Sequence, residues 1–170
     1  MKIIGTIFLL ICFVSCTNSK GNSAQIIQEK SNVSIISKDD ISKINYIEFV
    51  LDSKAEKIFE TWAKYIELEN LMTNLKQGDL SFFKDNDALL LAFIEDFKST
   101  VPDQINSPSI QVRIKALETK IYKLESAVSL STTSKEDMIS SVKELLIAFS
   151  NFNLQINKKF EKESQNIQKP

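Results

Sequence analysis

The stretch Ser109–Ser129, with the sequence SIQVRIKALETKIYKLESAVS, decides the fold class of this chain. Its large apolar residues recur at spacings that alternate between four and three, as in a heptad repeat: Ile110, Ile114, Leu117, Ile121, Leu124 and Val128. After the polar connector 129–134, a similar stripe follows at Met138, Val142, Leu145, Phe149, Phe152, Ile156 and Phe160. Two matched apolar stripes joined by a short loop predict an antiparallel helical hairpin.

Two further helical segments precede this hairpin. Residues 38–76 carry one apolar stripe at Ile44, Ile47, Leu51, Ala55, Ile58, Trp62 and Tyr65. This stripe favours a single long helix that ends before Gly78, although Ser53 and Glu56 have the form of a capping box and leave a break near Asp52 open.

The second of these segments, residues 80–101, has its own apolar face, formed by Phe83, Leu90, Phe93, Ile94 and Phe97. Pro102 ends this segment, and Pro108 is well placed to begin the next helix. The four stripes together predict an all-α fold, either an antiparallel four-helix bundle or a pair of helical hairpins, over residues 38–163. A frayed tail is expected at residues 164–170.

The composition excludes several classes of function. The chain has 170 residues, with 21 Lys and Arg against 22 Asp and Glu, which argues against a nucleic-acid binder. It has no His, so it lacks the commonest general base and metal ligand, including the Glu-x-x-His pairs of di-iron bundles. Only 3 Gly are present, and no phosphate-binding glycine loop occurs. The charge is uneven, because residues 38–100 carry 8 basic and 13 acidic residues, whereas residues 101–170 carry 10 and 8.

The remaining candidates for chemistry each have a simpler structural explanation. Glu67 and Glu69 are two residues apart on a helix and therefore point in different directions, as expected of a solvated face. The run 85–87, Asp-Asn-Asp, fits a helix cap better than a calcium loop. Trp62 and Tyr65 lie on the apolar stripe, which favours core packing over a ligand groove. We therefore expect no catalytic, metal-binding or cofactor-binding residues, and a protein that is not an enzyme.

The first sixteen residues, MKIIGTIFLLICFVSC, have the pattern of an export signal. Lys2 is followed by an apolar run too short to span a membrane, and the chain becomes polar at Thr17. The segment Phe13-Val14-Ser15-Cys16 resembles the lipobox of bacterial lipoproteins, although Phe13 stands where Leu is usual. This resemblance covers only Met1–Cys16, and it implies that residues 1–15 are removed and that Cys16 is acylated. The richness in Lys, Ile, Asn and Ser, with a single Arg, also resembles proteins from AT-rich genomes such as those of Bacteroidota.

Residues 16–37 would then form a lipidated Cys and a flexible tether, because this stretch is polar and has few residues to bury. The expected location is the bacterial cell envelope, at the outer membrane in a Gram-negative cell. The expected function is a non-enzymatic helical interaction or scaffold module that is held at a membrane and binds a protein partner or itself. The alternative is a carrier of a small apolar ligand, with a pocket inside the bundle.

Overall fold

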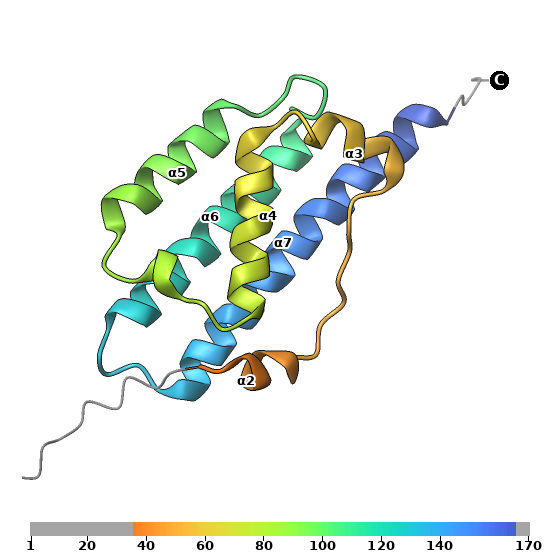
Figure 1. The fold of residues 1–170 in the computed structure, drawn as a ribbon. Coiled ribbons are helices and arrows are strands. Elements are labelled where there is room, and N and C mark those ends of the chain that lie inside the picture. Colours follow the sequence, from red (N-terminus) through yellow and green to blue (C-terminus); the bar gives the residue numbers. More distant parts are fainter. Residues whose placement is uncertain (1–35, 166–170) are drawn as a thin grey trace, which may run out of the picture. The chain divides into compact units, whose positions relative to one another are not determined.

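Within residues 36–165, the range that the computed structural model describes apart from the side chain of Lys54, all regular elements are helical. In the order and with the labels of Figure 1 they are α2 (Lys38–Ser42), α3 (Ser53–Phe59), α4 (Ala63–Lys76), the 3-10 turn η1 (Ser81–Phe83), α5 (Asp87–Ser99), α6 (Pro108–Ser129) and α7 (Lys135–Ser164). The predicted all-α fold class is confirmed.

Helices α6 and α7 form the predicted antiparallel hairpin (Figure 1). Pro108 is the first residue of α6, where its missing N–H costs no hydrogen bond. Ser134 caps α7, because its hydroxyl accepts a hydrogen bond of 3.1 Å from the N–H of Asp137. The two apolar stripes are buried along the hairpin, with only their last residues, Val128 and Phe160, partly exposed. The heptad spacing therefore identified both helices and the faces that they bury.

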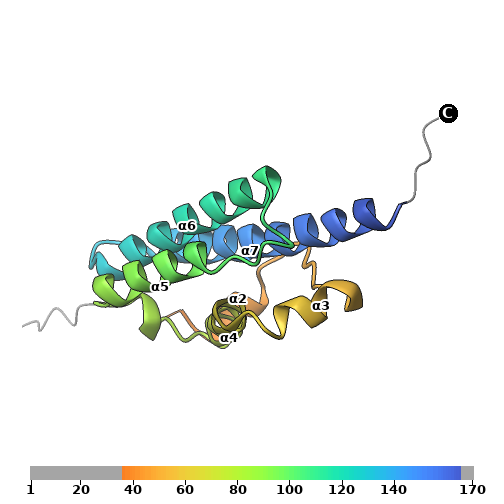
Figure 2. The ribbon, with the colours of Figure 1, turned by 90° about the horizontal axis from the view of Figure 1, so that it is seen from above.

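Helices α4 and α5 complete the bundle. Figure 1 shows consecutive helices from α4 to α7 running in alternating directions. In Figure 2, where α4 is seen almost end-on, α4 lies on one side of a layer formed by α5, α6 and α7. The apolar face predicted for residues 80–101 is buried at all five positions, from Phe83 to Phe97. The main core thus lies between α4 and the layer of three helices.

The expectation of one long helix over residues 38–76 is wrong. Residues 43–52, which we call the strap, leave α2 through a turn at Lys43 and then run extended along α7 to α3 (Figure 1). Ile47, assigned to the buried stripe, is 74% exposed. The strap ends where the carboxylate of Asp52 accepts a hydrogen bond of 3.0 Å from the N–H of Ala55 and so caps α3. The cap is therefore Asp52 and not Ser53.

A second break separates α3 from α4 at residues 60–62. Trp62 precedes α4, its ring is buried, and its indole N–H donates to the hydroxyl of Thr100 at 3.0 Å. The Trp62 ring stacks on Phe97 with ring centroids 4.7 Å apart. The prediction that Trp62 belongs to the core is confirmed, and its anchoring to the end of α5 explains why the chain turns here.

Gly78 ends α4, as predicted. Because it has no side chain, it also leaves room for the backbone at the start of the described range. Its φ of 88° lies in the left-handed region, and hydrogen bonds from Gly78 to Leu75 and from Asp79 to Asn74 complete a Schellman motif. A Cβ on Gly78 would lie 3.0 Å from the backbone nitrogen of Lys38. Ile36, assigned to the tether by its sequence, is fully buried beside this turn.

The short helix α2 is fixed by Asp40. Its carboxylate accepts hydrogen bonds from the N–H and hydroxyl of Ser37, at 2.9 and 2.7 Å, and pairs with the ammonium of Lys135 on α7 at 2.7 Å. Hydrogen bonds from Lys135 and Ser37 hold the pKa of Asp40 well below its usual value of 3.8. This lowered pKa means that the contribution of Asp40 to stability is complete above pH 3.8 and is lost as the pH falls towards the folded-state pKa.

Asp40→Asn should therefore reduce the acid sensitivity of the fold. The variant keeps the shape of the side chain but loses the charge that pairs with Lys135. We expect the wild type to lose more stability than the variant between about pH 5 and pH 2. Urea denaturation followed by the fluorescence of Trp62 measures this difference at each pH. Identical pH dependence in the two proteins would contradict the role assigned to Asp40.

The N-terminal predictions concern residues that the structure does not describe. The signal peptide 1–15, Cys16 and the tether up to residue 35 lie outside the described range, as do residues 166–170 of the predicted tail. Helix α7 extends to Ser164, one residue beyond the expected end of the bundle. None of the helices within residues 36–165 has both the length and the apolar character needed to cross a membrane.

Candidate functional site

An open cleft of about 360 Å³ lies where the strap, α3 and α4 meet. It is lined by Val50, Leu51, Glu56, Phe59, Glu60, Tyr65, Ile66 and Glu69. The rings of Phe59 and Tyr65 are buried, whereas Val50 and Ile66 are exposed at the surface. The cleft therefore combines an apolar, aromatic interior with an accessible edge.

The charged residues among the described lining of this cleft are all acidic. Glu56 comes from α3, Glu60 from the turn that follows it and Glu69 from α4, and all three residues are exposed. None of these three carboxylates forms an ion pair with any side chain that the structure describes. Carboxylates gathered at a concave surface raise the local concentration of cations. The cleft is therefore suited to a cationic group.

The interior of the cleft is rigid because its aromatic rings belong to the core. Phe59 and Tyr65 meet edge to face with ring centroids 4.5 Å apart. Tyr65 also stacks on Phe149 of α7 at 6.1 Å. Burial raises the pKa of the Tyr65 hydroxyl, and the negative charge of Glu69 raises it further. Tyr65 is therefore a neutral hydrogen-bonding group at ordinary pH.

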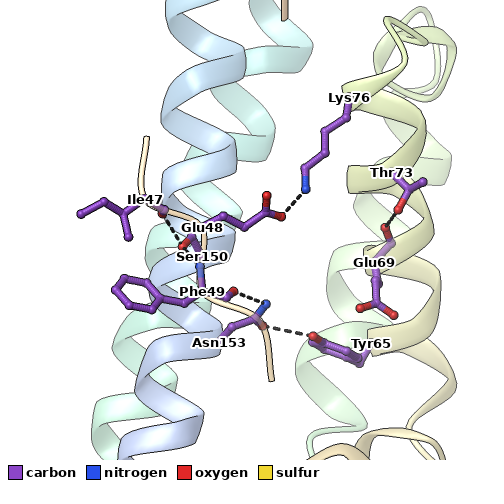
Figure 3. A network of polar contacts seen from close by, with 9 residues as sticks. All are labelled: Ile47, Glu48, Phe49, Tyr65, Glu69, Thr73, Lys76, Ser150 and Asn153. Carbon is purple, nitrogen blue, oxygen red and sulfur yellow. Dashed lines mark hydrogen bonds and ion pairs between the residues drawn. The ribbon is translucent and has the colours of Figure 1, made fainter. Parts of the chain in front are cut away.

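The strap is held against α7 by buried polar side chains (Figure 3). The hydroxyl of Ser150 donates to the carbonyl of Ile47 and accepts from the N–H of Phe49, both at 2.8 Å. The amide of Asn153 donates to the carbonyl of Phe49 and accepts from the hydroxyl of Tyr65, both at 3.1 Å. These contacts join the strap, α7 and α4 in one network, to which an ion pair between Lys76 and Glu48 adds.

Asn157 continues this row one turn further along α7. Its amide donates to the carbonyl of Val50 at 2.7 Å and accepts from the N–H of Asp52 at 3.0 Å. Ser150, Asn153 and Asn157 are spaced by three and four residues and so lie on one face of α7. We call these three residues the ladder. Its hydrogen bonds fix the position of Val50 and Leu51, which form one wall of the cleft.

Among the residues singled out by the sequence, only part of the aromatic set belongs to this site. Tyr65 is a core residue, as predicted, and it lines the cleft together with the buried Phe59. Glu69 is on a solvated face, as predicted, and borders the cleft, whereas Glu67 pairs with Lys64 at 3.0 Å. Cys16 lies outside the described residues.

The Asp-Asn-Asp run lies elsewhere, at the start of α5. Asn86 occupies the cap position, but its side-chain amide donates to the carbonyl of Ser81 at 3.0 Å instead of accepting from the helix. The predicted capping hydrogen bond is therefore not made. In residues 36–165, no group of three or more Cys, Asp or Glu side chains is arranged to hold a metal ion.

The space inside the bundle bears on the alternative of an apolar-ligand carrier. The space between α4, α5 and α6, lined by residues such as Leu68, Phe93 and Leu117, measures about 10 Å³. This is roughly the room that one water molecule needs, whereas small-molecule sites span about 300–1,000 Å³. The cleft is much larger than this interior space, so it is the better candidate site.

Sequence reasoning missed the ladder. Its residues directly follow Phe149, Phe152 and Ile156 of the apolar stripe, so a polar stripe runs beside the apolar one. Small polar and amide side chains repeated in this way beside a buried seam are a signal for a polar contact with another segment. No protein-family model, curated protein or solved structure matches this chain.

Proposed function

We propose that this protein is a lipid-anchored lipoprotein of the bacterial cell envelope that acts as a non-enzymatic interaction module. The observation that carries the interaction role is the cleft, with its three exposed carboxylates around a rigid aromatic interior. Its partner is a protein segment that presents Lys or Arg next to an apolar side chain. The carboxylates attract the cation, and the exposed Val50 and Ile66 contact the apolar neighbour.

The anchor rests on the lipobox-like segment Phe13-Val14-Ser15-Cys16. Two or three acyl chains on Cys16 provide stable attachment without a spanning helix, since each buried CH₂ contributes about 0.8 kcal/mol. The tether then keeps the bundle near the membrane surface, at the outer membrane in a Gram-negative cell. A carrier of small apolar ligands has less support, because the interior space between α4, α5 and α6 is only about 10 Å³.

Mass spectrometry of the protein from its native host tests the anchor. The mature chain should begin at Cys16 and carry the mass of its acyl groups. Cys16→Ala should abolish the acylation and release the protein from the membrane fraction. A native N-terminus at another residue, without lipid, would refute the anchor and leave the cleft proposal in place.

The cleft proposal is tested by removing its charges. The triple variant Glu56→Gln, Glu60→Gln, Glu69→Gln keeps the shape of the cleft and removes its three carboxylates. In crosslinking of the detergent-solubilised envelope, a partner captured by the wild type should be recovered about tenfold less with this variant. Capture should also weaken with added salt, because charge attraction is screened.

A matched control separates the cleft from net charge. Glu95→Gln, Glu136→Gln, Glu161→Gln changes the net charge by the same amount at exposed positions away from the cleft. This control should capture the partner as well as the wild type does. Equal loss in both triple variants, or in neither, would refute the cleft as the contact surface.

A further inference from the structure

The strap is bound through its backbone. Ser150 contacts the carbonyl of Ile47 and the N–H of Phe49, and Asn153 contacts the carbonyl of Phe49. The amide nitrogen of Asn157 donates to the carbonyl of Val50, and its amide oxygen accepts from the N–H of Asp52, the last strap residue. The strap and α7 run in the same direction, and each ladder residue binds main-chain groups that every non-proline residue has.

The strap side chains contribute unevenly to this attachment, because Ile44, Tyr46 and Leu51 are partly buried against the core, whereas two others are exposed. Ile47 is 74% exposed and Val50 is 70% exposed, although both lie at the centre of the bound segment. A segment recognised by its main chain can be replaced by another extended segment with different side chains, as in strand addition to a sheet edge. The ladder therefore selects for an extended conformation more than for a sequence.

The ladder is also preorganised. With the strap in place, Ser150 is 2% exposed and Asn153 is 3% exposed. The hydroxyl of Tyr65 donates to the amide oxygen of Asn153, which leaves the amide N–H₂ directed at the strap. Buried polar groups that are already oriented lose little freedom on binding, and they incur a cost when they are left without a partner. These are properties of a binding site for a peptide.

We propose that the ladder is a binding site for extended polypeptide backbone, which the strap fills in the free protein and which an extended segment supplied in trans fills when the strap opens. This inference depends neither on the lipid anchor nor on the carboxylates of the cleft. It requires that the strap detaches while α4–α7 remain folded.

Hydrogen exchange of the unmodified full chain tests this requirement. The amides of Phe49 and Asp52 donate to the ladder, and the amide of Leu145 lies within the buried part of α7. We expect the two strap amides to exchange at least tenfold faster than Leu145, with rates that low urea concentrations barely change. Exchange of all three amides at one common rate would show that the strap opens only on global unfolding and would overturn the proposal.

A peptide with the strap sequence, residues 43–52, tests binding in trans by fluorescence anisotropy. Phe49→Pro removes the N–H from which the hydroxyl of Ser150 accepts a hydrogen bond, and so weakens the attachment of the protein's own strap. Val50→Pro is the matched control, because no described group accepts from the N–H of Val50. We expect the peptide to bind the Phe49→Pro protein at least tenfold more tightly than it binds the Val50→Pro protein. In the Val50→Pro protein the intact strap competes with the peptide at high effective concentration.

The ladder itself is tested in the Phe49→Pro protein. Adding Ser150→Ala and Asn153→Ala should weaken peptide binding at least tenfold, with helical circular dichroism confirming that the bundle is folded. Dimers of the wild type that disappear in this ladder variant would also support the site, with a second copy as the supplier of the segment. A folded Phe49→Pro protein that does not bind the peptide, or that binds it equally without the ladder, would overturn the proposal.

Discussion

Phe152→Ala is expected to lower the free energy of unfolding by about 3–5 kcal/mol. Phe152 is fully buried on α7 and faces rings from two other helical segments. Its ring centroid lies 5.9 Å from that of Phe97 and 6.5 Å from that of Trp62. Truncation leaves a cavity where α7, α5 and the start of α4 meet, and the rigid aromatic neighbours cannot collapse into it.

Phe160→Ala is the matched control for this substitution. Phe160 lies on the same apolar stripe of α7 but is only partly buried near the end of the helix. We expect it to cost less than about 1.5 kcal/mol, because little cavity is created. Urea denaturation followed by circular dichroism and by the fluorescence of Trp62 measures both variants. Equal losses would mean that the aromatic cluster is not the centre of the core.

The hairpin α6–α7 could be predicted because the sequence features that specify it lie within the two helices and their ends. The heptad spacing, the proline at the start of α6 and the serine at the start of α7 all agree on the same two helices. In such a case the apolar face, the caps and the connector are each visible within a few turns of helix. Gly78 was equally clear, since a left-handed residue is the usual end of a helix.

The strap could not be predicted in the same way. Its apolar residues continue the helical stripe of residues 38–76, and nothing in their spacing separates an extended segment from a helix. The extended form is stabilised by hydrogen bonds to Ser150, Asn153 and Asn157, about a hundred residues later in the chain. Tertiary contacts of this kind override local helical preference.

The candidate site was predicted only in part. Tyr65 stood out in the sequence, but its place on the apolar stripe indicated core packing, which is also its role in the structure. The cleft depends on the breaks at the strap and at residues 60–62, which bring Glu56 and Glu69 to one surface. Because one long helix would have separated these side chains, the wrong helix prediction concealed the cleft.

Asn153→Ala is the second substitution with a large expected effect, about 2–4 kcal/mol of the free energy of unfolding. The change removes one hydrogen bond to the strap and leaves the buried hydroxyl of Tyr65 without an acceptor. A lost hydrogen bond costs about 0.5–1.5 kcal/mol, and an unsatisfied buried group about 1–3 kcal/mol. Urea denaturation at neutral pH measures the total.

Two further variants separate these contributions. Ser141→Ala is a control for a buried polar residue of α7, because Ser141 donates only to the carbonyl of Asp137 in its own helix, and it should cost less than about 1 kcal/mol. Tyr65→Phe in the Asn153→Ala protein removes the unsatisfied hydroxyl and should restore part of the lost stability. A double-mutant cycle should therefore give a coupling energy of about 1 kcal/mol or more between Tyr65 and Asn153. Additive losses would show that the two side chains are independent, and the orientation of Asn153 towards the strap would then need another cause.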